Sequence, residues 1–246
     1  MREDIQAGLV PASHLRVAAI TPFTSLDYPG KLSAVVFVRG CPWRCVYCHN
    51  PWMQPRAAAD TDDSWERVEK LIARRKGLLD AVVFSGGEPC TDPALSSAID
   101  VVRSYGMQVG LHTGGAYPRH LAQIIDRLDW IGLDVKAVPG DDAHFERVVR
   151  VKSADAAFLE SFEIIKRSGV AFEARSTVHP ALFTTGQILA TAKWLADRGT
   201  DTYALQIYRK APGIDTGLDP VTHDWPGADV ESALKGMFKH FILRRN

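Results

Sequence analysis

Three cysteines stand close together in the first quarter of the chain. Cys41, Cys45 and Cys48 have the spacing C-x3-C-x2-C and follow the apolar run 34–38 and Gly40. Thiolates on one short loop can bind three irons of a [4Fe–4S] cluster, which leaves the fourth iron open to another ligand. We therefore expect Cys41, Cys45 and Cys48 to hold one such cluster.

Two other interpretations of these cysteines remain open. Together with His49 they could form a Cys3His zinc site, although zinc ligands usually come as two separated pairs and His49 directly follows Cys48. Alternatively, Cys45 and Cys48 could form a redox pair, which leaves Cys41 unexplained. Cys90 stands apart from the other three and is expected to be a small buried residue.

A glycine pair precedes an acidic residue in the string 85–89, which reads SGGEP. Gly86 and Gly87 allow the backbone to approach a ligand closely, and the carboxylate of Glu88 can receive an ammonium group. A turn with a surface glutamate is the simpler alternative. Arg175 ends a later apolar run, where its guanidinium could bind a carboxylate in a bidentate manner.

Other polar residues also stand where apolar runs end. Asp134 and Lys136 flank Val135, and a surface ion pair of little energetic value would explain them as well as a site would. His179 fits a turn-capping role as well as a catalytic one. In parallel α/β folds the carboxyl ends of the strands carry the active site, so we expect these groups to share one face.

Short β-branched runs alternate with stretches of helical spacing. The runs cover residues 33–38, 81–84, 108–111, 130–135, 170–175 and 202–207. This alternation predicts parallel βα units, and six strands are too few to close an eight-stranded barrel. The candidates are therefore a partial (β/α)6 barrel, with parallel strands and outer helices, and an open α/β sheet. Residues 15–24 are expected to form an edge hairpin, and residues 230–243 a helix.

Composition favours one globular α/β domain over residues 1–246, with a core at about 15–210 and a C-terminal extension over 211–246. Lys plus Arg and Asp plus Glu both total 29, so charge favours neither nucleic acid nor an anionic membrane as a partner. The short basic groups at 74–76 and 244–245 are expected on solvated helix faces. Without a signal-like N-terminus or a long apolar run, we expect a cytoplasmic protein.

With Tyr47 just before the last cysteine, the motif resembles the signature of the radical S-adenosylmethionine (SAM) superfamily. The resemblance implies a partial barrel, one [4Fe–4S] cluster and SAM, whose amine and carboxylate chelate the open iron. One electron then cleaves SAM to methionine and a 5′-deoxyadenosyl radical. The residues expected to contact SAM are Tyr47, His49, Gly86, Gly87, Glu88, Thr113, Asp134, Val135, Lys136, Arg175 and Gln206.

Two strings narrow the resemblance. CVYCHNP at 45–51 is similar to activases of glycyl radical enzymes, and DYPGK at 27–31 to the branch that activates the anaerobic ribonucleoside-triphosphate reductase. The resemblance implies a glycyl radical enzyme as protein substrate and a low-potential electron donor such as flavodoxin or ferredoxin. The alternatives are an activase of pyruvate formate-lyase or a related enzyme, a 7-carboxy-7-deazaguanine synthase, and a non-catalytic iron–sulfur protein.

His112 departs from this pattern. Activases of this kind often have an aspartate there, which holds a monovalent cation together with the aspartate of the D-x-K string, here Asp134. The resemblance therefore leaves that cation site in question. The chain also lacks an insert with a second set of cysteines, which favours the short activases with a single cluster.

Overall fold

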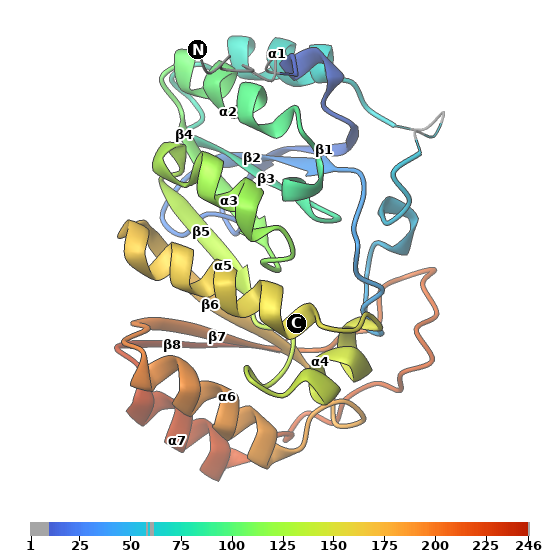
Figure 1. Ribbon diagram of the computed structural model, residues 1–246, viewed down its shortest axis with the longest axis vertical. Coiled ribbons are helices and arrows are strands. Elements are labelled where there is room, and N and C mark those ends of the chain that lie inside the picture. Colours follow the sequence, from blue (N-terminus) through green and yellow to red (C-terminus); the bar gives the residue numbers. More distant parts are fainter. Residues whose placement is uncertain (1–9, 58, 60–61, 246) are drawn as a thin grey trace, which may run out of the picture.

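The computed structural model describes residues 10–57, 59 and 62–245, and its centre is one curved sheet of eight strands. The strands follow one another in chain order across the sheet (Figure 1). They are β1 (Val17–Thr24), β2 (Ser33–Val38), β3 (Ala81–Gly86), β4 (Gln108–Thr113), β5 (Trp130–Asp134), β6 (Ala171–Val178), β7 (Thr202–Ile207) and β8 (His240–Arg244). Strand β1 is antiparallel to β2, and all later neighbours are parallel.

The sheet does not close, since β1 and β8 are its two edges. This confirms the partial α/β barrel. The six expected strands are β2 to β7, and the expected edge element at 15–24 is the antiparallel strand β1. Three strands extend farther toward the carboxyl end than expected: β3 continues to Gly86, β4 to Thr113 and β6 to Val178. The polar residues at these ends therefore lie within the strands and are held by the ladder.

Helices connect the parallel strands and cover the outer face of the sheet (Figure 1). Ser64 caps α1, Thr184 and Gln187 form a capping box at α6, and Gly169 ends α5 in the left-handed conformation. Among the described residues, no helix is both long enough and apolar enough to span a bilayer. The helices are α1 (Trp65–Arg74), α2 (Leu95–Ser104), α3 (Pro118–Ile124), α4 (Asp142–Val149), α5 (Ala154–Ser168), α6 (Thr185–Asp197) and α7 (Ala228–Met237).

Two apolar cores lie on opposite faces of the sheet, because neighbouring strand residues point to opposite sides. Outward residues such as Val36 and Val82 pack with the helices in the larger core. Inward residues form a small core inside the barrel that includes Val35, Val83 and Trp130. The rest of the inner face is available for polar groups.

The loop that joins β1 to β2 closes the interior of the barrel at the amino-terminal ends of the parallel strands. The ring of Tyr28 stacks on Trp130 with centroids 5.0 Å apart, and the carbonyl oxygen of Asp27 lies 2.8 Å from His112 Nε2. Asp27 and Tyr28 belong to the DYPGK string. Its tyrosine therefore fills the amino-terminal end of the barrel, beneath the polar residues at the other end.

The expected helix at 230–243 is wrong in its second half. Helix α7 ends at Met237, Phe238 is extended, and β8 follows. Phe241 is paired in register with Tyr203 of β7, and their rings are 6.3 Å apart. Because β8 adds a strand to the sheet, Arg244 lies at a strand end and not on a solvated helix face.

Candidate functional site

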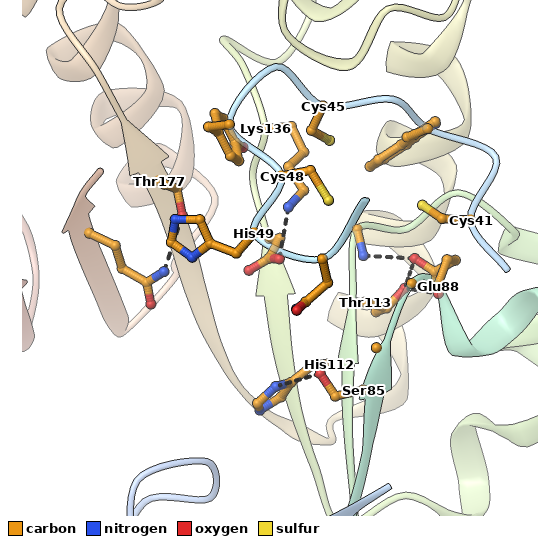
Figure 2. A pocket seen from close by; sticks show the side chains of 18 of the residues that line it. Cys41, Cys45, Cys48, His49, Ser85, Glu88, His112, Thr113, Lys136 and Thr177 are labelled. Atoms are coloured by element: carbon orange, nitrogen blue, oxygen red, sulfur yellow. Dashed lines mark hydrogen bonds and ion pairs between the residues drawn. The ribbon is translucent and has the colours of Figure 1, made fainter. Parts of the chain in front are cut away.

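A cavity of about 410 Å³ opens at the carboxyl ends of the parallel strands. Figure 2 shows the thiols of Cys41, Cys45 and Cys48, on one loop, beside Glu88, which follows β3, and Lys136, which follows β5. The expected residues that line the cavity are Cys41, Cys45, Tyr47, Cys48, His49, Gly86, Gly87, Glu88, Thr113, Asp134, Lys136 and Gln206. The structure thus brings together all but two of the expected residues, which are discussed below.

The cysteine loop is held by backbone hydrogen bonds on both sides. Cys41 N donates to the oxygen of Gln54 at 3.0 Å, and Val46 N donates to the oxygen of Val148, near the end of α4, at 3.0 Å. Cys48 N donates to Cys45 O at 3.0 Å and closes a tight turn between the last two cysteines of the motif. These contacts fix the loop before any cofactor binds.

Burial sets the electrostatics of the thiols. It raises the pKa of Cys41 to about 12, with nearby Glu88 adding to the effect, and that of Cys45 to about 11, against the opposing charge of Lys136. Thiolates here therefore need a positive partner such as iron. Among the described residues, no three His, Cys, Asp or Glu side chains are arranged around one ion. A cubane does not require this, because each thiolate binds a different iron.

His49 is turned away from a shared zinc site. Its Nε2 lies 2.8 Å from the carbonyl oxygen of Arg209, and its ring lies 5.8 Å from that of Tyr208. Tyr47 is 5 % exposed, and its hydroxyl has no hydrogen-bond partner among the described residues. The Nζ of Lys136 lies 5.5 Å from the centre of its ring. The donor set and this unpaired hydroxyl fit a cluster with a polar ligand beside it.

Glu88 is a buried carboxylate, 2 % exposed, that is held on several sides. Its oxygens accept from the hydroxyl of Thr113 at 2.8 and 2.9 Å and from Gly114 N at 2.9 Å, and the amide of Cys90 donates at 3.2 Å. Burial raises its pKa, which these donors and Lys136 counteract. An ammonium group in the cavity would favour the charged form.

Two glycines let neighbouring loops approach this carboxylate. A Cβ on Gly87 would lie 2.3 Å from the carbonyl oxygen of Gly40, at the start of the cysteine loop. Glu88 N donates to that same oxygen at 2.8 Å. A Cβ on Gly114 would meet the ring of Trp43 at 2.3 Å. Glycine is therefore required where the cysteine loop packs on β3 and β4.

Asp134 and Lys136 form an ion pair of 2.9 Å in the cavity wall, not on the open surface. Burial raises the pKa of Asp134, but Lys136 and Arg175 more than offset it and leave the pKa below its usual value. For Lys136 burial acts downward, and Asp134 with other groups holds the pKa well above normal. Both residues therefore carry charge in the cavity wall.

Arg175 and Val135, two of the residues expected to contact SAM, are not among the residues that line the cavity. The Nε of Arg175 donates to Glu173 at 2.7 Å, and its guanidinium lies 5.0 Å from the centre of the Trp130 ring. The guanidinium thus binds a carboxylate of the protein itself. Val135 packs in the outer core, and His179 caps the turn at Ala181, whose amide donates to Nδ1 at 3.0 Å.

His112 lies between Ser85 Oγ at 3.3 Å and the carbonyl oxygen of Asp27 at 2.8 Å. Burial lowers its pKa to about 4, and the Arg175 guanidinium adds to this effect. The imidazole is therefore neutral at neutral pH. A neutral ring beside Asp134 supplies no second negative charge, so the structure offers no support for the cation site left in question above.

Sequence reasoning missed several cavity residues. Trp43 and Thr177 line the cavity, as does Arg244 at the end of β8. Trp43 could have been considered, since it stands inside the cysteine motif. Arg244 could not be found, because its strand was expected to be a helix.

Comparison with known proteins agrees with this geometry. The Radical SAM superfamily matches residues 35–195. A relative in Methanocaldococcus jannaschii, named for glycyl-radical enzyme activation, is 28 % identical over 209 residues, 81 % of this chain and 82 % of its own. A pyruvate formate-lyase-activating enzyme of Clostridium pasteurianum is 31 % identical over 172 residues, 68 % of this chain and 70 % of its own.

Solved structures share the fold. SuiB of Streptococcus suis, bound to S-adenosylmethionine, superposes with a TM-score of 0.64 at 12 % identity over 84 % of this chain. This chain spans about half of SuiB, 48 % of its length, and at such identity the likeness concerns the fold alone. The fold, the three-cysteine loop and the sequence matches together lead to one conclusion. The chain belongs to the radical SAM superfamily and is a radical SAM enzyme similar to those that activate glycyl radical enzymes.

Proposed function

We propose that this enzyme generates a glycyl radical on a partner enzyme, and that the partner is an anaerobic ribonucleoside-triphosphate reductase. The observation that carries the proposal is the cavity itself, which joins the three-cysteine loop to polar strand ends in a sheet that stays open between β1 and β8. An open side can admit a segment of another protein. The DYPGK string at 27–31 favours the reductase among glycyl radical enzymes.

In this proposal Cys41, Cys45 and Cys48 hold the cluster. When bound, the reduced cluster would supply the one electron that cleaves SAM to methionine and a 5′-deoxyadenosyl group, and this group would take one hydrogen atom from the partner's glycine to give 5′-deoxyadenosine. The electron comes from a low-potential donor such as flavodoxin or ferredoxin. The chemistry belongs to the cofactors, and the protein contributes binding and orientation.

The chain's own residues surround the place where SAM would bind. Glu88 offers a fixed carboxylate for an ammonium group, because Thr113 and two backbone amides already hold its position. Lys136 offers a positive charge for a carboxylate, while its ion pair with Asp134 keeps it in the wall. Trp43 and Tyr47 supply buried aromatic surface that excludes water from the cavity.

Anaerobic mixing of reduced enzyme, SAM and the reductase tests the proposal. We expect a glycyl radical doublet in the electron paramagnetic resonance (EPR) spectrum, and no doublet when the reductase carries alanine at its radical glycine. A doublet on pyruvate formate-lyase but not on the reductase would assign the partner differently, an outcome that the Clostridium pasteurianum relative favours. Loaded enzyme that cleaves SAM but gives a doublet on neither partner rejects glycyl radical activation.

An iron–sulfur protein without catalysis is the remaining alternative. It would account for the cysteines but not for the buried Glu88 or for the pair of Asp134 and Lys136 in the same cavity. The two hypotheses, an activase and a non-catalytic iron–sulfur protein, can be distinguished by incubating the reduced protein with SAM alone. Chromatography then shows whether 5′-deoxyadenosine has formed. Absence of that product from fully loaded protein would favour the non-catalytic one.

A further inference from the structure

Arg244 places a guanidinium in the cavity at the open edge of the sheet. One terminal nitrogen donates to Gln206 Oε1 at 2.9 Å, and the other donates to the two carboxylate oxygens of Glu173 at 3.0 and 3.2 Å. The side chain of Arg244 is 34 % exposed, whereas that of Glu173 is 1 % exposed. Gln206 and Glu173 therefore hold the guanidinium in place, and part of it remains exposed toward the cavity.

The charges around Arg244 do not balance. Glu173 also accepts from Arg175 Nε at 2.7 Å, so one buried carboxylate serves two guanidinium groups. Gln206 is neutral, and its amide donates onward to Thr177 Oγ1 at 3.2 Å. The cluster of Arg175, Glu173 and Arg244 thus keeps one positive charge in excess on the inner wall.

Arg244 also has hydrogen-bonding capacity to spare. A guanidinium carries five N–H donors in a planar fork. The contacts of Arg244 with described residues go to only two side chains, Gln206 and Glu173. Because Arg244 lines the cavity, an acceptor that enters at the end of β8 could use the remaining donors. Such an acceptor gains a charge-assisted hydrogen bond whose donor is already oriented.

We infer that Arg244 binds a backbone carbonyl oxygen of the partner's extended glycine segment as that segment enters beside β8. This inference rests on the proposed function and deepens it by naming the residue that receives the protein substrate. A peptide carbonyl is a strong acceptor without charge, and a glycine segment has no side chains to keep its carbonyls away from the wall. The sulfonium of SAM is cationic and is disfavoured beside the excess charge on this wall.

The chain offers a matched control in the next residue. Arg245 points away from the cavity, donates to the carbonyl oxygen of Trp225 at 2.7 Å and pairs with Glu231 of α7. Arg245→Ala therefore removes an arginine from the same end of β8 without touching the cavity. Arg244→Lys guards against misfolding, because it keeps the charge but loses the planar fork.

The test uses cluster-loaded enzyme and two readouts. The first is the affinity for a synthetic peptide that spans the reductase's radical glycine, and the second is the number of glycyl radicals formed on the reductase per 5′-deoxyadenosine. For Arg244→Ala we expect about tenfold weaker peptide binding, equal to about 1.4 kcal/mol, and a lower radical yield per 5′-deoxyadenosine. Arg244→Lys should fall between Arg244→Ala and wild type, and Arg245→Ala should match wild type.

Three results would overturn the inference while the proposed function stands, because wild type would still give the doublet. The first is equal loss of peptide affinity in Arg244→Ala and Arg245→Ala, which would mean that only the position of β8 matters. The second is a raised KM for SAM with unchanged peptide affinity, which would assign Arg244 to the SAM carboxylate. The third is wild-type behaviour of Arg244→Ala in both readouts. Absence of the doublet on the reductase with wild-type enzyme rejects the proposed reductase activation and the inference together.

Discussion

Replacement of Gly87 by alanine should separate the cysteine loop from the strand on which it packs. Gly87 has no positive φ, so the effect is one of space and not of backbone conformation. The new Cβ would lie 2.3 Å from Gly40 O, about 1 Å short of an ordinary contact. It would also lie 3.2 Å from Cys41 Cβ. Backbone cannot rotate aside as a flexible side chain can, so the loop itself must move.

The cost follows from this displacement. The bond from Glu88 N to Gly40 O, now 2.8 Å, would stretch to about 3.8 Å, beyond the range of a hydrogen bond. Its loss costs about 1 kcal/mol, and crowding in a packed site adds about 1–3 kcal/mol. We therefore expect the free energy of unfolding to fall by about 2–4 kcal/mol, which lowers Tm by roughly 5–15 °C in a chain of this length.

Thermal unfolding and iron content of anaerobically reconstituted protein measure the two consequences. Gly236→Ala is the matched control, because a Cβ there meets nothing within 4 Å and the residue lies inside helix α7. The control should keep full iron content and gain up to about 1 kcal/mol from helix propensity. Full iron content together with a wild-type Tm in Gly87→Ala would refute the packing argument. A lower Tm with full iron content would refute only its link to cluster binding.

Three further predictions concern the ligands, the buried histidine and a helix cap. Cys48→Ala should abolish iron loading, whereas Cys90→Ala should keep it; an empty site in the second variant would show that the ligands are misassigned. The pKa of His112 falls from 6.5 unfolded to about 4 folded, so the unfolded state binds more protons between these values. The free energy of unfolding of the metal-free wild type should therefore fall by up to about 3 kcal/mol as pH falls from 6.5 to 4. Denaturant unfolding of His112→Asn should show a fall that is smaller by this amount. Parallel plots of the free energy of unfolding against pH for the two proteins would contradict the lowered pKa of His112. Thr184→Ala removes the capping box with Gln187 and should cost about 1 kcal/mol without changing iron content.

The six central strands could be predicted because parallel strands covered on both faces are near-continuous apolar runs. The gathering of the three cysteines at one cavity could also be predicted, since their spacing is local and one loop supplies all three. The last strand could not. Val230, Leu234, Phe238 and Phe241 repeat at helical spacing, and only pairing with β7, some 38 residues earlier in the chain (202 against 240), makes residues 240–244 extended.

Arg175 shows why the direction in which a side chain points is hard to predict from the sequence. It was expected at a strand end but lies inside β6, and the direction of its guanidinium depends on Glu173, two residues earlier in β6, and on Trp130 and Gly132 of β5. Glu173 supplies a carboxylate below it, Trp130 supplies an aromatic face, and Gly132 leaves room, since a Cβ there would lie 2.7 Å from the Arg175 guanidinium carbon. The contact with Glu173 is local, but those with Trp130 and Gly132 cross from β6 to β5 and no local pattern encodes them.

The distribution of charge on the inner face indicates a division of labour along the chain. The early strands carry the groups suited to the cofactors, with Glu88 on the β3 side and the pair of Asp134 and Lys136 after β5. The last two strands carry Gln206 and Arg244, whose side-chain hydrogen bonds among the described residues go to each other, to Glu173 and to Thr177. Glu88 and Arg244 share no hydrogen-bond partner among the described residues, so the free energies of changes at these two positions should add. In the double variant Glu88→Gln/Arg244→Ala, we therefore expect SAM binding to be weakened as much as in Glu88→Gln alone. Peptide binding should be weakened as much as in Arg244→Ala alone. Strong non-additivity would mean that cofactor and partner share one subsite.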